Sequence, residues 1–232
     1  MSEEFETQQF YRNISNNFLD PSINHVSHQN YLKLLKEKYN FYPKVIYDIG
    51  AHLLTWARLA NNIWPDSKII AFEAMDNIEF LYKENNFEYT IGVFSDINDK
   101  EIIFYQSNKS PGGNSYYKEI SWASDIYYGK ESERLVKTTT IDTAVKNKKY
   151  PLPDLVKIDV QGCELDILKG MKESIVNCQH LIVELQHVNY NSGAPLNTES
   201  ILFIESIGFK LETSLFSNNG PDGDYHFIKN SL

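Results

Sequence analysis

Polar side chains follow almost every apolar run of this sequence, at the points where strands are predicted to end. In an open parallel sheet the carboxyl ends of the strands meet at one edge, where small ligands bind. Carboxylates and amides there can bind hydroxyl and ammonium groups, and a carboxylate can also accept a proton. One such residue alone is an ordinary turn residue, so their recurrence is what indicates a site: Asp48, Glu73, Ser95, Asp96, Asp159, Gln161, Glu184 and Gln186.

The turn after the first predicted strand, KVIYDIG, is interpreted as a cofactor loop. A dinucleotide loop needs further glycines so that the backbone can approach a pyrophosphate, and His52 and Thr55 stand where GxGxxG requires them. S-adenosylmethionine (SAM) has no phosphate and needs one close backbone approach, which Gly50 supplies, with Asp48 placed near its ammonium group. The missing glycines therefore count against NAD more than against SAM.

Glu73 follows Gly50 at about the 20-residue distance expected between a glycine turn and an acid that binds ribose. A carboxylate suits a diol because it accepts two hydrogen bonds at once. The predicted cofactor-binding residues are Asp48, Gly50, Ala51, His52, Glu73, Ala74, Ser95, Asp96, Asp159 and Gln161.

If the cofactor is SAM and the acceptor is an alcohol, a group must take the proton of that alcohol. His187 is the favoured base, because imidazole has a pKa near ~6.5 and the residue follows a strand that should border the site. Asp159 is the rival base, or it could bind a divalent cation such as Mg²⁺ together with Glu184. No ligand spacing in the sequence establishes a metal, and His25 and His28 are expected on the surface.

Lys157 and Asp159 are two residues apart in one predicted strand, as are Glu184 and Gln186 in the next, so each pair points to one face. A buried lysine is costly without a partner, so Lys157 is expected to pair with Asp159 or Glu184. The predicted cluster would orient the acceptor hydroxyl as part of the catalytic site. A structural ion pair beneath the sheet is the alternative.

Two loops, SPGGNSYY and NNGPDGDY, are expected to line the site of the acceptor. Tyrosine rings could stack on a sugar ring, and amides and carboxylates could bind its hydroxyls, although ordinary packing of the aromatic residues is an equal alternative. The predicted acceptor-binding residues are Asn114, Tyr116, Tyr117, Gln186, Asp222 and Asp224.

The apolar runs alternate between strand and helix periods, which predicts an α/β fold with a Rossmann-like, doubly wound, mostly parallel sheet. A hairpin is expected around the long loop 108–133, and a C-terminal antiparallel hairpin ends the chain. Residues 1–43 are expected to form an N-terminal helical lead-in, which is partly ordered over residues 1–30 and becomes helical at HQNYLKLLKEKYN. Residues 44–232 are expected to form the domain itself.

Composition restricts the function classes. The net charge of −9 argues against nucleic acid as a partner, since no basic stripe offsets it. No apolar stretch reaches the ~18 residues of a membrane span, and the acidic start does not resemble a signal peptide. A cytoplasmic protein is expected, and a homo-oligomer is compatible with the sequence.

Four segments carry a resemblance to a known family: VIYDIGA, IIAFEAM, VKIDVQGCELDILKG and LIVELQHVNYNSGAPL. In this order and at these distances they resemble the FkbM family of SAM-dependent methyltransferases. The resemblance implies a Rossmann-like sheet and methyl transfer to a hydroxyl oxygen, often of a sugar or secondary metabolite.

The resemblance also implies roles for single residues. It places Asp48 and Gly50 on the SAM loop, Glu73 at the ribose, Asp96 near the adenine and residues 159–164 on the most specific block of the family. Two residues depart from the family pattern. Leu54 stands where glycine is usual, and Gln161 stands where glutamate is usual.

Three functions thus remain open at this point. The leading hypothesis is a SAM-dependent O-methyltransferase acting on a carbohydrate or a similar hydroxylated molecule. An NAD-dependent oxidoreductase shares the ribose acid but lacks the glycine fingerprint. A degenerate relative that keeps the fold as a binding or scaffold module is the third, motivated by Leu54 and Gln161.

Overall fold

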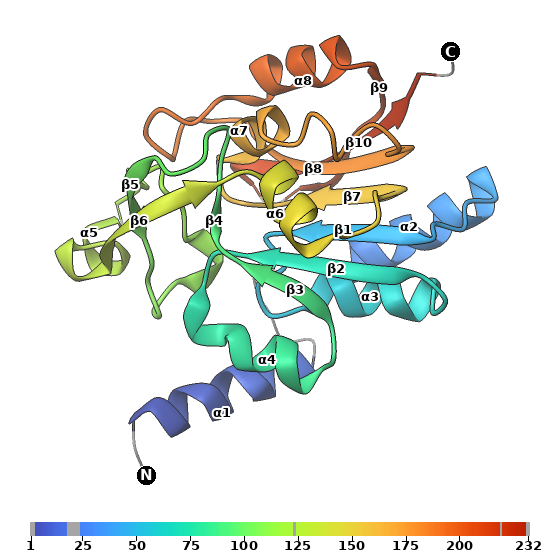
Figure 1. The fold of residues 1–232 in the computed structure, drawn as a ribbon. Helices are drawn as coiled ribbons and strands as arrows, with labels where there is room; N and C mark the ends of the chain where they lie inside the picture. The colour runs from blue at the N-terminus through green and yellow to red at the C-terminus, as the bar shows by residue number, and fades with distance from the viewer. Residues whose placement is uncertain (1–2, 18–23, 123, 219, 231–232) are drawn as a thin grey trace.

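A seven-stranded sheet organises the chain in the computed structural model, which describes residues 3–17, 24–122, 124–218 and 220–230. Its strand order is β3-β2-β1-β7-β8-β10-β9, and the first five strands run parallel (Figure 1). β10 is antiparallel to both β8 and β9, so the predicted sheet and C-terminal hairpin are confirmed. The strands are β1 Val45–Ile49, β2 Lys68–Glu73, β3 Glu88–Ile91, β7 Leu155–Ile158, β8 His180–Gln186, β9 Phe209–Asn218 and β10 Asp222–Lys229.

Helices cover both faces of this sheet, as a doubly wound fold requires. Figure 1 shows α6 in front of the strands and α2 and α3 behind them. The helices are α1 Glu3–Asn16, α2 His25–Tyr39, α3 Thr55–Ile63, α4 Glu79–Glu84, α5 Ser124–Tyr127, α6 Ile141–Lys148, α7 Glu164–Lys169 and α8 Asn197–Ser206, with 3₁₀ turns at Asp76–Ile78, Pro111–Gly113 and Lys130–Ser132.

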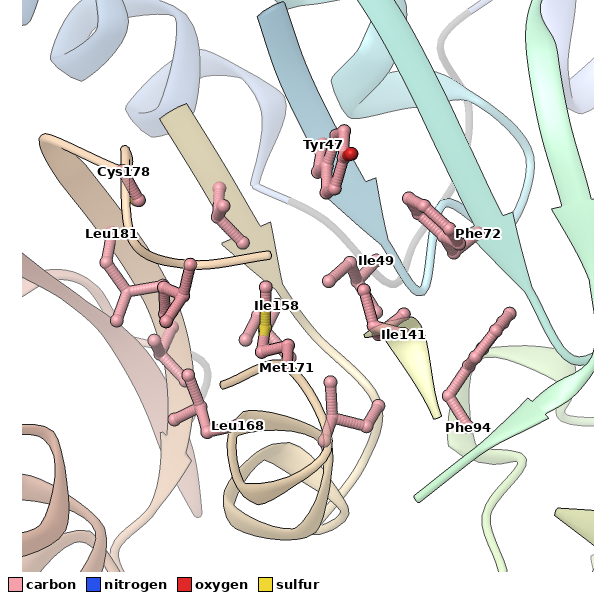
Figure 2. Packing of buried hydrophobic residues seen from close by; sticks show 14 of the residues in the cluster. Tyr47, Ile49, Phe72, Phe94, Ile141, Ile158, Leu168, Met171, Cys178 and Leu181 are labelled. Carbon is pink, nitrogen blue, oxygen red and sulfur yellow. The ribbon is translucent and has the colours of Figure 1, made fainter. Parts of the chain in front are cut away.

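Each face of the sheet has its own hydrophobic cluster, because alternate strand residues point to opposite sides. On one side Tyr47, Ile49 and Phe72 belong to one cluster with residues of α6, α7 and α8. Figure 2 shows Ile141 of α6 and Leu168 of α7 in this cluster. On the other side Ile46 and Ile182 pack with residues of α1, α2, α3 and α4. The central strands β1, β7 and β8 are buried along their whole length, which fixes the edge where their carboxyl ends meet.

A smaller sheet stands beside the central one. It consists of β4 (Val93–Phe94), β6 (Glu133–Thr139) and β5 (Glu101–Tyr105), in that order. β5 and β6 are antiparallel, so the hairpin predicted around the long loop is confirmed. That loop folds back on the hairpin through an isolated bridge between Tyr105 and Ser115, which places the segment 110–117 over the edge of the main sheet.

The N-terminal region contains more structure than the sequence predicted. α1 was not expected, because its polar composition hides the apolar face on which Tyr11 is buried. His28 on α2 was predicted to be a surface residue, and this is wrong: it is 1% exposed and its Nε2 lies 2.9 Å from Asp224 Oδ2. Residues 1–2 and 18–23 of the predicted lead-in lie outside the described residues, and the division at residue 43 stays a prediction.

Within the described segments, no helix is both long enough and apolar enough to cross a membrane.

Candidate active site

The turn between β1 and α3 is built from three left-handed residues. Gly50, His52 and Leu54 have φ values of 79°, 43° and 63°. At Gly50 an added Cβ would lie 1.8 Å from the carbonyl oxygen of Asp159, so this glycine allows β1 and the segment after β7 to meet. Gly50 was predicted to contact the cofactor. In the structure its lack of a side chain also allows this close approach to the backbone of Asp159.

Leu54 keeps the left-handed conformation that a glycine would adopt easily. Its side chain is fully buried in the cluster beneath α2 and α3. Burial of a leucine contributes roughly 1.5–3 kcal/mol, which offsets the ~1–2 kcal/mol of backbone strain. Leucine at position 54, where the family usually has glycine, is therefore compatible with this turn in the described structure.

Glu73 ties this turn to the end of β2. Its Oε2 accepts a hydrogen bond from the backbone N–H of His52 at 2.7 Å. Its Oε1 accepts from the N–H groups of Ala74 and Met75, both at 2.8 Å. A carboxylate has about four acceptor positions, so Oε2 retains capacity for a hydroxyl donor.

A cavity opens beside the turn, with Gly50, Ala51 and His52 in its lining. We call it the first cavity. The buried Nδ2 of Asn114 has no hydrogen-bond acceptor among the described residues, although its Oδ1 accepts from Ser107 N at 2.8 Å. The lining combines the turn, the acid and apolar residues of the small sheet: Gly50, Ala51, His52, Thr55, Trp56, Phe72, Glu73, Ala74, Val93, Phe94, Phe104, Pro111, Gly112, Asn114, Tyr116, Lys157, Asp159, Val160, Gln161, Cys163 and Ile167.

SAM fits this chemistry. Glu73 offers an acceptor to a ribose hydroxyl, and the orphaned Nδ2 of Asn114 offers a donor to a polar atom of the ligand. Phe94 and Phe104 supply an apolar surface suited to an adenine ring. Asn114 and Tyr116, which the sequence assigned to the acceptor, thus line the same cavity as the predicted cofactor residues.

Ser95 and Asp96 lie behind this cavity and do not line it. Ser95 Oγ donates to Asp96 Oδ1 at 3.2 Å and lies 3.3 Å from the hydroxyl oxygen of Tyr116. The hydroxyls of Tyr116 and Tyr117 both donate to Asp166 Oδ2, at 3.0 and 2.7 Å. These contacts fix the tyrosine pair, and only Tyr116 reaches the cavity.

Lys157 is the cation of the site. Its Nζ lies 2.8 Å from Asp159 Oδ2 and 4.0 Å from Asp48 Oδ1, which confirms the predicted pairing with Asp159. Burial alone would lower the pKa of Lys157, but the two carboxylates hold it above its usual value. Burial raises the pKa of Asp48 to about 6. Asp48 does not line the first cavity itself, but it lies beside Lys157, which does.

Glu184 and Asp159 form an unequal acid pair. Burial and the charge of Asp159 raise the pKa of Glu184 well above its usual value. Burial also opposes the charge of Asp159, but Lys157 and a hydrogen bond from Glu184 lower the pKa of Asp159. Asp159 is therefore the stronger acid of the pair, and Glu184 is the weaker one.

Gln161 joins the pair. Its Nε2 donates to Glu184 Oε2 at 2.7 Å and lies 3.3 Å from Asp159 Oδ1. A glutamate at this position would add a third acid and remove both donated hydrogen bonds. The amide thus suits the charge of this pair, and its left-handed φ of 56° directs it there.

A second, more open cavity of about 1280 Å³ adjoins the first. α1 contributes Phe10, Tyr11 and Ile14 to one side, and the loop 108–113 forms another. The polar side is made by Gln161, Glu184 and Asp222. The two cavities share four residues: His52, Pro111, Gly112 and Gln161.

His187, Asp224 and Gln186 lie outside both cavities. The ring of His187 is 5.9 Å from that of Tyr225, on the face opposite Glu184. Asp224 is fully buried against His28, and Gln186 donates to Asn191 Oδ1 at 2.8 Å. The strand alternation explains this, because His187 follows Gln186 and therefore points the other way.

Sequence reasoning missed Tyr11 and Tyr190. Tyr11 belongs to the helix that was not predicted, and its buried hydroxyl has no hydrogen-bond partner among the described residues. The Tyr190 hydroxyl donates to Asp222 Oδ2 at 2.6 Å, and its oxygen lies 3.2 Å from Gln161 Oε1. The only sequence signal for Tyr190 was its position in the segment after β8. In the part of the chain that the structure describes, no three His, Cys, Asp or Glu side chains are arranged to hold a metal ion.

Solved structures share this fold. A putative O-methyltransferase from Klebsiella pneumoniae superposes with a TM-score of 0.53 at 12% identity, covering 97% of this chain and 90% of its own. The plantazolicin methyltransferase BpumL, solved in complex with SAH, gives a TM-score of 0.51 at 11% identity, covering 96% and 90%. The strand order, the glycine turn and the acid after β2 give the chain the Rossmann-like fold that these methyltransferases have.

The family is more specific. The methyltransferase FkbM domain matches residues 48–211, and the chain belongs to this family. The hexuronic acid methyltransferase AglP of Haloferax volcanii is 26% identical over 142 residues. That match spans 61% of this chain and 55% of AglP, so the chain covers about half the length of this relative.

Proposed function

We propose that this chain transfers a methyl group from SAM to a hydroxyl of a sugar or similar polyol. The observation that carries the proposal is the junction of the two cavities at His52 and Gln161, with the Asp159–Glu184 pair beside it. A cofactor in the first cavity and an acceptor in the second would meet at this junction. The relative AglP, named as a hexuronic acid methyltransferase, supports a sugar acceptor.

The residues of the first cavity would hold the cofactor. Glu73 accepts from ribose, Asn114 donates to a polar atom, and the turn at Gly50, Ala51 and His52 bounds the methionine end. SAM supplies a methyl group on a positively charged sulfur, which an alcohol oxygen can attack. Positioning of the two reactants is the main contribution of the protein to such a step.

Asp159 is the proposed proton acceptor, because it lines the first cavity and its lowered pKa makes it the more readily ionised member of the acid pair. Lys157 orients its Oδ2, and Gln161 faces its Oδ1. His187, the base favoured from the sequence, points to the other face of the sheet and is not part of this proposal.

Titration calorimetry with S-adenosylhomocysteine tests the cofactor site. Binding by the wild type, a loss of about tenfold or more in Glu73→Ala and no binding of NAD are expected. Absence of S-adenosylhomocysteine binding would favour the scaffold hypothesis, and binding of NAD the oxidoreductase.

Methyl transfer to a panel of sugars tests the base. Asp159→Asn should reduce kcat by about 10²-fold or more while S-adenosylhomocysteine affinity changes little. His187→Asn is the matched control and should retain activity. Loss of activity in His187→Asn, with activity retained in Asp159→Asn, would instead identify His187 as the base.

A further inference from the structure

Asp222 is an incompletely satisfied acid on the polar side of the second cavity. It is 6% exposed, and its Oδ2 accepts from the Tyr190 hydroxyl at 2.6 Å. Its Oδ1 is buried without a hydrogen-bond partner among the described residues. No cation of the described chain lies within 4.0 Å of this carboxylate in an ion pair. A buried acceptor left in this state is costly unless a ligand satisfies it.

The cations nearby are engaged elsewhere or lie at the periphery. Lys157 is held by Asp159 and Asp48, and His28 pairs with Asp224. Lys109 lines the cavity from an exposed loop position, and His187 faces the opposite side of the sheet.

The acids around Asp222 add to the deficit of positive charge. Burial raises the pKa of Asp222, the hydrogen bond from Tyr190 lowers it, the charges of Asp159 and Asp224 raise it further, and His187 lowers it. The acid side of the cavity therefore has a negative potential, and the lysine that lines this cavity, Lys109, stands on its exposed loop.

We propose that the acceptor carries a protonated amine, as an amino sugar or another amino-bearing polyol does, and that Asp222 binds this ammonium group through Oδ1. An ammonium has three donors and a full charge, so it satisfies both the orphaned oxygen and the local potential. A neutral hydroxyl would supply one hydrogen bond without the charge. A uronate would bring a second negative charge to the acid side, so this chain and AglP would differ in the acceptor they take. The inference rests on the proposed function, because it names the substrate class of that site.

A matched ligand series tests the charge directly. With the protein saturated with S-adenosylhomocysteine, binding is measured by calorimetry for four ligands: methyl 2-amino-2-deoxyglucoside, its N-acetyl form, methyl glucoside and methyl glucuronide. The amine should bind at least tenfold more tightly than each of the other three. Acetylation keeps the ring and removes the charge, so it separates charge from shape.

Asp222→Asn tests the residue. It should reduce the affinity for the amine at least tenfold and leave S-adenosylhomocysteine affinity within twofold, which also reports that the variant is folded. Asp125→Asn on exposed α5 removes the same charge far from the carboxylate and should preserve the preference.

Three outcomes overturn the inference: equal affinities across the series, preference for the glucuronide, or no amine binding at millimolar concentration while S-adenosylhomocysteine still binds. Loss of S-adenosylhomocysteine binding in the wild type would instead count against the proposed function itself.

Discussion

The ammonium nitrogen of Lys157 lies between two carboxylates from neighbouring strands, 2.8 Å from Asp159 Oδ2 and 4.0 Å from Asp48 Oδ1. Lys157 is 2% exposed, so its removal would leave two acids in a poorly solvated place. Lys157→Met should lower the free energy of unfolding by about 3–5 kcal/mol, as breaking one partner of a buried pair does. Urea denaturation at pH 7 measures this loss.

Lys83→Met is the matched control, because Lys83 pairs with Glu79 on the surface of α4. It should change the unfolding midpoint only slightly, since exposed pairs contribute little. Equal effects of the two substitutions would mean that Lys157 does not hold the acids.

Leu54 allows the strain of the cofactor turn to be separated from its packing. Replacement by alanine or glycine removes the same buried contacts, so both variants should be less stable than the wild type, by about 2–4 kcal/mol. At φ 63°, however, glycine avoids a strain of roughly 1 kcal/mol that alanine retains. Leu54→Gly should therefore be more stable than Leu54→Ala, the reverse of the usual order.

Chemical denaturation of the two variants decides the point. If alanine were the more stable of the two, residue 54 would not be left-handed in solution. Binding of S-adenosylhomocysteine by Leu54→Gly is expected to persist, because the family glycine is then restored.

Much of the fold was predictable because the spacing of apolar residues within each short segment indicates whether that segment is a strand or a helix. Each buried parallel strand is a short apolar run followed by a helix, and Lys157 and Asp159 show their common face by spacing alone. The strand ends then identify the edge where Glu73, Asp159 and Glu184 gather.

Contacts between distant segments were not predictable in the same way. His28 and Asp224 pair across 196 residues, and neither local pattern indicates burial of a histidine in a polar helix. Asn114 reaches the first cavity because the long loop folds back through Tyr105 and Ser115. α1 was missed because its single buried aromatic, Tyr11, stands in a polar, asparagine-containing helix.

Gln161→Glu tests why this chain has an amide where its family has an acid. The new carboxylate would face Asp159 and Glu184 and would lose the hydrogen bonds that Gln161 donates. Its folded-state pKa would therefore lie above the unfolded value of ~4.3. Such a group is tolerated while it is protonated, and stability is lost as the pH rises through its folded pKa.

The variant should thus be less stable than the wild type at pH 8 by about 1–3 kcal/mol, and the deficit should shrink at pH 5. Denaturation at the two pH values measures the difference. Gln179→Glu, at an exposed position before β8, should show no such dependence. A deficit of equal size at both pH values would exclude repulsion among the acids as its cause.

His226 gives stability a dependence on pH of the opposite sign. It is fully buried, with Nδ1 2.8 Å from the Tyr31 hydroxyl and Nε2 3.0 Å from His180 Nδ1. Burial lowers the pKa of His180 to about 4 and that of His226 to about 3. Both rings stay neutral in the folded protein at a pH where the unfolded chain, with pKa values near ~6.5, takes up protons.

The contribution of the two histidines to the free energy of unfolding is therefore complete above pH ~6.5. It is lost as the pH falls toward 4, at about 1.4 kcal/mol per pH unit for each ring. Burial raises the pKa of Asp48 to about 6 and that of Glu164 to about 7, and these acids contribute the opposite slope in an overlapping range. The difference between variant and wild type removes their contribution. His226→Gln should lower stability at pH 7 yet lose less of it between pH 6.5 and 4. A second replacement, His180→Gln, should flatten the profile further, whereas parallel profiles for all three proteins would mean that these rings are protonated in the folded state.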